Sequence, residues 1–225
     1  MTGSQSPLAV FFDLDGVLID SRAAFVASIN AALADIDEPA RPAAELEAAI
    51  GPPLPDTFRE LVDPDKVQAG VDGYYRHAHG DGIRLTKVFD GIPELLESLS
   101  YDLPLLVATS KPVDLAGPLL EALDVRHHFY DVLGPPREDP GEDKLATLRR
   151  ATERIRYRNG VMIGDRSFDM AAARELSLIG IGVTWGIDDE DELRDAGAEL
   201  VVDDVERLEA ELRRLQRSAA GQAIR

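Results

Sequence analysis

The chain has 225 residues, 42 of them acidic and 24 basic, and its formal net charge is −18 at pH 7. This acidity argues against the basic surface of a nucleic-acid-binding protein and against adsorption to anionic membranes. The sequence has no cysteine, which excludes disulfides, a cysteine nucleophile and thiolate-bound zinc or iron–sulfur clusters. Hydrophobic residues make up 44% of the chain, enough to build a globular core.

The amino-terminal segment bears on localisation. Residues 1–6 contain no basic side chain, and the apolar run that follows them covers only residues 7–12. Such a segment resembles neither a signal peptide nor a membrane span. We therefore expect a cytoplasmic protein without a membrane partner.

The first apolar run, at residues 8–15, is rich in Leu, Val and Phe and predicts a buried strand. No strand pattern follows between residues 20 and 83, where apolar residues recur at helical spacing (Phe25, Ile29, Leu33) and Ser21 is the expected N-cap. Further helical segments are expected at 43–50, 56–61 and 65–77. We therefore predict a small all-helical cap domain over residues 20–83, inserted into a core formed by residues 1–19 and 84–225.

Strand and helix patterns alternate through the rest of the chain. Apolar runs typical of buried strands lie at 103–110, 129–134, 160–165 and 178–185, with a weaker run at 199–203. Helical patterns lie at 92–99, 112–123, 143–155, 168–176 and 205–215. This alternation predicts an α/β fold with a Rossmann-like parallel sheet and helices on both of its faces.

Polar residues gather where three of these strands end. In an open parallel sheet, ligands bind beyond the carboxyl ends of the strands, so we expect a functional site there. The residues concerned are Asp13 and Asp15 after the first strand, Thr109, Ser110 and Lys111 after the second, and Asp165 and Asp169 at and after the fourth.

The aspartates of this edge predict a divalent cation. Asp13 and Asp15 are two residues apart, so along an extended strand their side chains would project to the same side. Carboxylates so close to each other repel unless a cation lies between them, and Asp165 adds a third. Oxygen ligands suit Mg²⁺ better than zinc. Gly16 would let backbone amides approach an anion closely.

Three segments resemble the motifs of a known family. FDLDGVLIDS (residues 12–21), ATSKP (108–112) and IGDRSFD (163–169) are similar to the first, second and fourth motifs of the haloacid dehalogenase superfamily of phosphohydrolases. GPPLPDTF (51–58) and VFDGIPELLESL (88–99) resemble its phosphoglycolate phosphatase-like members. The helical insertion is similar to the small helical cap of that superfamily. The resemblance runs from Leu8 to about Leu208.

The resemblance implies catalytic roles for four residues. Asp13 would be the nucleophile that takes the phosphoryl group, and Asp15 would protonate the leaving oxygen and later activate water. Thr109 would bind a phosphate oxygen. Lys144 is the candidate for the lysine of the third motif, because Lys111 lies too close to the second motif for that role.

The resemblance also implies the ligands of the substrate phosphate and of Mg²⁺. The phosphate would be held by Gly16, Thr109, Ser110 and Lys144. The metal would be held by Asp13, Asp165 and the backbone carbonyl of Asp15, with Asp169 as a second ligand or as an outer-shell partner.

The substrate stays open at this point. The third-motif lysine is usually followed by proline, whereas Leu145 follows Lys144 here. A Mg²⁺-dependent, phosphoglycolate phosphatase-like enzyme is the leading prediction, and a 5′-nucleotidase-like phosphatase or a β-phosphoglucomutase-like phosphotransferase are alternatives. A phospho-receiver signalling module is the non-enzymatic alternative. The expected partner is a small phosphorylated metabolite, with the protein a monomer or homodimer.

Overall fold

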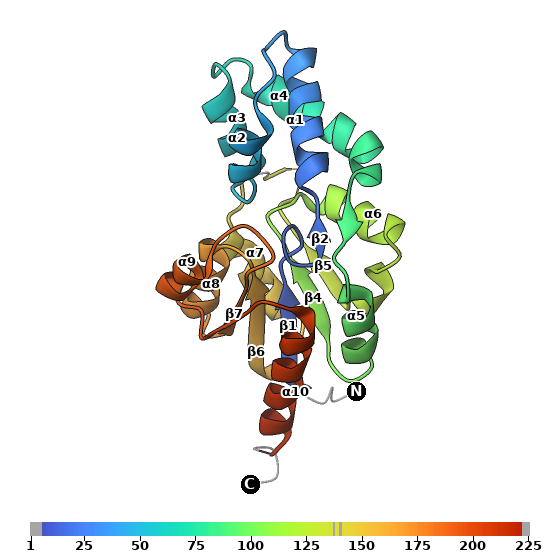
Figure 1. Ribbon diagram of the computed structural model, residues 1–225, viewed down its shortest axis with the longest axis vertical. Coiled ribbons are helices and arrows are strands. Elements are labelled where there is room, and N and C mark those ends of the chain that lie inside the picture. Colours follow the sequence, from blue (N-terminus) through green and yellow to red (C-terminus); the bar gives the residue numbers. More distant parts are fainter. Residues whose placement is uncertain (1–5, 137, 140, 222–225) are drawn as a thin grey trace.

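The computed structural model describes residues 6–136, 138–139 and 141–221. The first five residues, on which the expectation about a leader partly rests, lie outside this range. A parallel sheet of six strands forms the centre, in the order β5-β4-β1-β6-β7-β8 (Figure 1). Its strands are β1 (Ser6–Phe12), β4 (Leu105–Ala108), β5 (Asp131–Leu133), β6 (Tyr157–Gly164), β7 (Ile179–Val183) and β8 (Leu200–Val202). The predicted α/β fold is confirmed.

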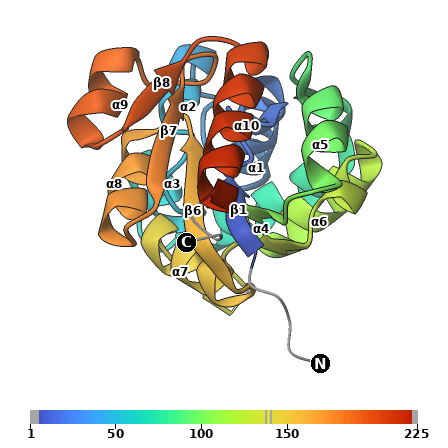
Figure 2. The same cartoon turned by 90° about the horizontal axis from the view of Figure 1, so that it is seen from below.

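Helices cover both faces of this sheet, as the alternation predicts (Figure 2). One face is covered by α5 (Ile92–Ser100), α6 (Val113–Ala122) and α10 (Val205–Gly221). The other is covered by α7 (Lys144–Glu153) and α8 (Ser167–Glu175), with α9 (Glu190–Ala196) packed beside α8. None of the helices formed by the described residues combines the length and apolar character that a membrane crossing requires.

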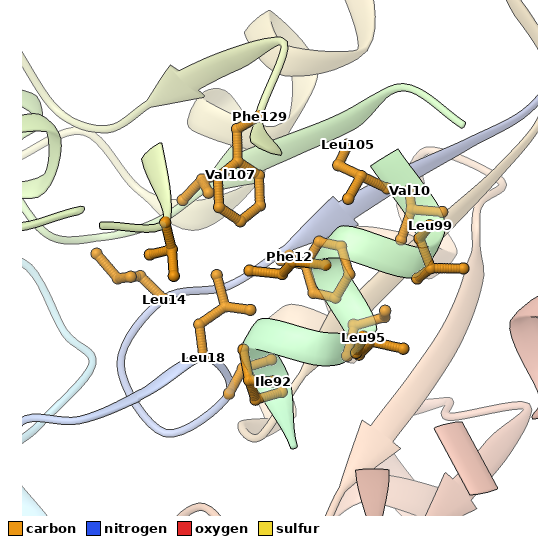
Figure 3. Packing of buried hydrophobic residues seen from close by; sticks show 14 of the residues in the cluster. Val10, Phe12, Leu14, Leu18, Ile92, Leu95, Leu99, Leu105, Val107 and Phe129 are labelled. Atoms are coloured by element: carbon orange, nitrogen blue, oxygen red, sulfur yellow. The ribbon is translucent and has the colours of Figure 1, made fainter. Parts of the chain in front are cut away.

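The central strand β1 is buried on both sides, which explains its unbroken apolar run. Val10 and Phe12 point into the core beneath α5, where they meet Leu95 and Leu99 (Figure 3). Ala9 and Phe11 point to the opposite face. Because successive strand residues face opposite sides, a strand between two helical layers needs apolar residues at every position.

The segment between β1 and α5 is mainly helical. It contains α1 (Arg22–Asp35), α2 (Ala43–Ala48), α3 (Leu54–Leu61), α4 (Val67–His77) and the single π-helical turn η1 (Ala78–Gly82). We call α1 to η1 the helical unit. It lies beyond one end of the sheet (Figure 1). Its apolar cluster contains residues such as Ile29, Leu33 and Phe58 and also includes Leu115 of α6.

Three local predictions need correction. The first strand ends at Phe12 and not at residue 15, because the chain turns after Asp13. Ser21 does occupy the N-cap position of α1, but its hydroxyl makes no capping bond and donates to the Asp15 carboxylate instead. The junctions of the helical unit also contain two strands that the sequence patterns do not show, β2 (Ile19–Asp20) and β3 (Lys87–Val88), which pair antiparallel.

Candidate active site

The site is built at the carboxyl ends of three neighbouring strands. Asp13 follows β1, Thr109 follows β4 and Asp165 follows β6, and these strands are adjacent in the order β4-β1-β6. The backbone of Asp13 remains tied to the sheet, since its N–H donates to the carbonyl of Ile163 at 2.8 Å. Thr109 is held in the same way by the carbonyl of Leu133, at 3.0 Å.

A buried cluster of three carboxylates lies at this edge. Asp13, Asp165 and Asp169 each offer an oxygen, and these oxygens lie within 4.8 Å of one another. Lys144, the first residue of α7, places its Nζ 2.6 Å from Asp13 Oδ1 and 2.9 Å from Asp169 Oδ1. The same Nζ donates to the carbonyl of Ala108 at 2.9 Å. A single lysine thus faces two of the three carboxylates.

The protonation of the cluster reflects its excess of negative charge. Burial raises the pKa of Asp165 well above its usual range, and the Asp13 and Asp169 carboxylates raise it further. Burial likewise raises the pKa of Asp169 to about 7, although Lys144 opposes this effect. Burial alone would lower the pKa of Lys144, but Asp13 and Asp169 outweigh it and keep that pKa above its ordinary value. An additional cation would relieve the remaining repulsion.

The surroundings of Asp165 fit such a cation. The side chain is fully buried, and its Oδ1 has no hydrogen-bond partner among the described residues. Two glycines make room for the carboxylate, because a Cβ would lie 2.0 Å from Asp165 Oδ2 at Gly16 and 2.3 Å from the same oxygen at Gly186. A set of carboxylate oxygens of this kind suits a hard divalent metal. The residues therefore fit Mg²⁺.

Asp15 lies outside the cluster of three carboxylates but lines the same pocket as Asp13. Its carboxylate accepts from the hydroxyl of Ser21 and lies 3.2 Å from Lys111 Nζ. Burial alone would lower the pKa of Lys111, but Asp15 outweighs it and keeps that pKa above its ordinary value. Asp13 and Asp15 thus have different environments despite their spacing.

A pocket opens beside these residues, between the sheet edge and the helical unit. Its polar side holds Asp13, Asp15, Thr109, Ser110, Lys111 and Arg166. Its apolar side is formed mainly by the helical unit, through Phe25, Ile50, Pro52, Leu54 and Tyr74. The predicted phosphate ligands Thr109 and Ser110 therefore line the same pocket as Asp13 and Asp15.

Arg166 is a pocket residue that the sequence analysis missed. Its Nη1 donates to the carbonyl of Ile50 in the helical unit, and its guanidinium lies over the ring of Phe168. Gly51, which has φ +120°, lies against that same ring, where a Cβ would meet Phe168 Cζ at 2.5 Å. These contacts join the loop before α3 to the start of α8. The signal in the sequence is only that Arg166 lies between Asp165 and Asp169.

A family model described as haloacid dehalogenase-like hydrolase matches residues 10–183 of the chain. Among curated relatives, a 5′-nucleotidase of Pseudomonas aeruginosa is 37% identical over 82% of this chain and 86% of its own. A phosphoglycolate phosphatase of Cupriavidus necator is 30% identical over 90% of this chain and 91% of its own.

A solved structure has the same fold over nearly the whole chain. The crystal structure of a predicted phosphatase from Clostridium acetobutylicum superposes with a TM-score of 0.83 at 33% identity. The match covers 93% of this chain and 99% of that one, so it includes the helical unit as well as the sheet.

Proposed function

The chain belongs to the haloacid dehalogenase-like hydrolase family and is a phosphatase, and on that premise we propose that it hydrolyses small phosphorylated metabolites with Mg²⁺ through an aspartyl-phosphate on Asp13. The observation that carries the proposal is the cluster of Asp13, Asp165 and Asp169 within 4.8 Å beside a pocket. Asp13 belongs to both the cluster and the pocket lining.

The two carboxylates of the first motif divide the chemistry. Lys144 donates to Asp13 Oδ1, so we assign the attack on the phosphorus atom to Oδ2 and the metal contact of Asp13 to the second lone pair of Oδ1. As the Asp13–phosphorus bond forms, the bond to the leaving oxygen breaks and Asp15 supplies its proton. In the second step Asp15 takes a proton from water, the water oxygen bonds to phosphorus, and the bond to Asp13 breaks to release inorganic phosphate.

Other residues hold the phosphoryl group and balance its charge. Mg²⁺ bound by Asp13, Asp165, Asp169 and the Asp15 carbonyl would neutralise charge that develops on the phosphoryl oxygens. Lys144 adds a fixed positive charge that the carboxylates keep protonated. Thr109, with the Ser110 amide, would donate to phosphate oxygens. The N–H of Gly16 (φ +82°), which the resemblance assigns to the phosphate, donates instead to the carbonyl of Ile19 at 2.9 Å.

The substrate candidates differ in what the leaving-group side of the pocket must accept. Phosphoglycolate is the leading candidate, and its carboxylate would need a cation. Two cations, Lys111 and Arg166, line the pocket. Both already have a carboxylate partner: Lys111 Nζ lies 3.2 Å from Asp15 Oδ2, and Arg166 Nε lies 2.8 Å from Asp188 Oδ1. A nucleoside 5′-monophosphate is the second candidate, because Phe25 and Tyr74 form an aromatic pair on the pocket wall, with ring centroids 5.7 Å apart.

The test is phosphate release from a panel of phosphoglycolate, nucleoside 5′-monophosphates and hexose phosphates, each with Mg²⁺ and with EDTA. We expect Mg²⁺-dependent release from at least one class and none from Asp13→Asn. Asp195→Asn, an exposed acid of α9, is the matched control and should retain the parent rate. Release in EDTA would contradict the metal assignment. Interconversion of hexose phosphates without net release would instead identify a phosphotransferase.

A further inference from the structure

The loop between β7 and α9 (residues 184–189) crosses directly over the fourth-motif segment that carries Asp165. The N–H of Ile187 donates to Asp165 Oδ2 at 3.0 Å, and the N–H of Asp188 donates to the Asp165 carbonyl at 3.1 Å. The loop thus holds both the side chain and the backbone of a proposed metal ligand.

Asp188 extends this contact to the next two residues of the segment. Its Oδ2 accepts from the N–H of Ser167 at 2.6 Å, and its Oδ1 lies 2.8 Å from Nε of Arg166. The Ser167 N–H belongs to the first turn of α8, where backbone donors lack partners within the helix and a carboxylate is favoured. Asp188 is only 9% exposed, so water does not compete strongly for these contacts.

These contacts fix how Asp165 presents its two oxygens. Ile187 occupies Oδ2, whereas Oδ1 is buried and accepts no hydrogen bond from the described residues. Gly16 and Gly186 enclose the carboxylate closely, so its position depends on where the loop lies. Partners that orient a metal ligand in this way affect metal affinity although they never touch the metal.

We propose that Asp188 is a positioning residue that fixes segment 165–167, so that Asp165 meets the divalent cation in one orientation and Arg166 reaches the carbonyl of Ile50. The proposal rests on the metal site of the proposed function. It assigns to Asp188 a role separate from that of its neighbour Asp189, whose side chain accepts from the Glu192 N–H as the N-cap of α9.

The experiment measures Mn²⁺ binding to the full chain by electron paramagnetic resonance, without substrate. Asp188→Ala removes both acceptors and should weaken binding about 10- to 100-fold. Asp188→Asn keeps an acceptor for the Ser167 N–H and loses the charge facing Arg166, so it should recover part of that loss. Asp189→Ala is the matched control: it removes a helix cap, lowers the melting temperature and should leave Mn²⁺ affinity unchanged.

Each outcome decides the proposal. Parent affinity in Asp188→Ala, or an equal loss in Asp189→Ala, would overturn it. If Asp188→Ala does not fold, the comparison of Asp188→Asn with Asp189→Ala decides in the same way. Absence of Mn²⁺ binding by the parent protein would overturn the metal site itself and this proposal with it. Tight binding by the parent without any phosphatase activity would count against the proposed function alone, because the ratio of affinities would still be measured.

Discussion

At the scale of single residues, Lys144 carries the charge balance of the site. Its Nζ faces Asp13 and Asp169 from a position that is only 4% exposed. Removing one partner of a buried ion pair is strongly destabilising, since it leaves an uncompensated charge. The sequence identifies Lys144 through the resemblance alone, because it lies 131 residues from Asp13 along the chain.

The different environments of Asp13 and Asp15 predict different failures in their variants. Asp13→Asn removes the proposed nucleophile, so not even one turnover should occur. Asp15→Asn keeps the nucleophile, and p-nitrophenyl phosphate needs little acid assistance, so Asp13 should still be phosphorylated. Breakdown needs a base worth about 10²–10⁴-fold. Stopped-flow measurement should show a burst of about one nitrophenolate per site followed by a near stall.

Two outcomes would contradict these assignments. A linear time course at the parent rate in Asp15→Asn would remove that residue from its role as base. A burst in Asp13→Asn would show that another group is phosphorylated.

The raised pKa of Asp169 predicts how the metal-free protein responds to pH. Between its ordinary value of 3.8 and the folded value of about 7, the folded state holds a proton that the unfolded chain has lost. The free energy of unfolding therefore falls as pH rises through this window. Asp169→Asn removes this contribution. In EDTA, the melting temperature of the variant minus that of the parent should therefore increase by several degrees from pH 5 to pH 8.

Scanning calorimetry at the two pH values checks this prediction. The exposed variant Asp195→Asn should follow the parent at both. Parallel pH profiles of Asp169→Asn and the parent would show that Asp169 does not carry the proton.

At the scale of elements, the long strands and helices are predictable and the shortest elements are not. Apolar runs in the sequence predict the strands β1, β4, β6 and β7, because both faces of each strand are buried. The two-residue strands β2 and β3 are too short to show a period. The π-helical turn η1 continues the chain directly from α4, whereas the sequence pattern predicts a helix that ends at residue 77 and no separate element after it.

Residues that act across elements are equally hidden in the sequence. The acidic run at 188–192 suggests a helix start, and Asp189 with Glu192 does form the capping box of α9. Asp188 looks the same in sequence, yet its side chain contacts Arg166 and Ser167, 21 or more residues earlier. Such contacts depend on how β6 and β7 lie side by side, which no local pattern encodes.

The contact between the helical unit and α8 predicts a sensitive glycine. Gly51→Ala would place a side chain in the left-handed region, at φ +120°, and against Phe168. Strain of about 1–2 kcal/mol should displace the loop over the pocket. We expect kcat/KM to fall about tenfold for the substrate found in the panel.

Steady-state kinetics on that substrate provides the measurement. Gly117→Ala in α6 is the control, because among the described residues its Cβ would meet no atom within 4 Å apart from the nearby backbone of its own helix. That variant should gain up to about 1 kcal/mol in stability and keep its kcat/KM. Equal kinetics in the two variants would show that the Gly51 contact does not matter for turnover.

At the scale of the whole molecule, the arrangement of the sheet and the helical unit forms the candidate active site. Strand order brings the ends of β4, β1 and β6 together, and the helical unit closes the pocket from the other side. The sequence predicts the edge because polar residues follow apolar runs. It places Lys111 at this edge for the same reason, but it does not predict that Arg166, just before α8, also lines the pocket.

We therefore expect removal of the metal to lower the free energy of unfolding of the whole protein. Mg²⁺ at about 100 times its Kd would add about 2.7 kcal/mol to the free energy of unfolding. For a chain of this size we expect the melting temperature to rise by about 5–10 °C. Asp165→Asn, which removes one of the proposed ligands, should show little rise. A rise of the same size in that variant would indicate general screening of the net charge of −18.

The pairing of β2 with β3 has a consequence for the evolution of such proteins. Ile19 pairs with Val88 and Asp20 with Lys87, so the chain leaves the sheet layer and returns to it at a single point. An intervening segment whose two ends already touch can be lengthened, shortened or exchanged by recombination without stretching the strands below. We therefore expect that the helical unit can be altered, and the apolar wall of the pocket with it, while the acidic cluster keeps its place.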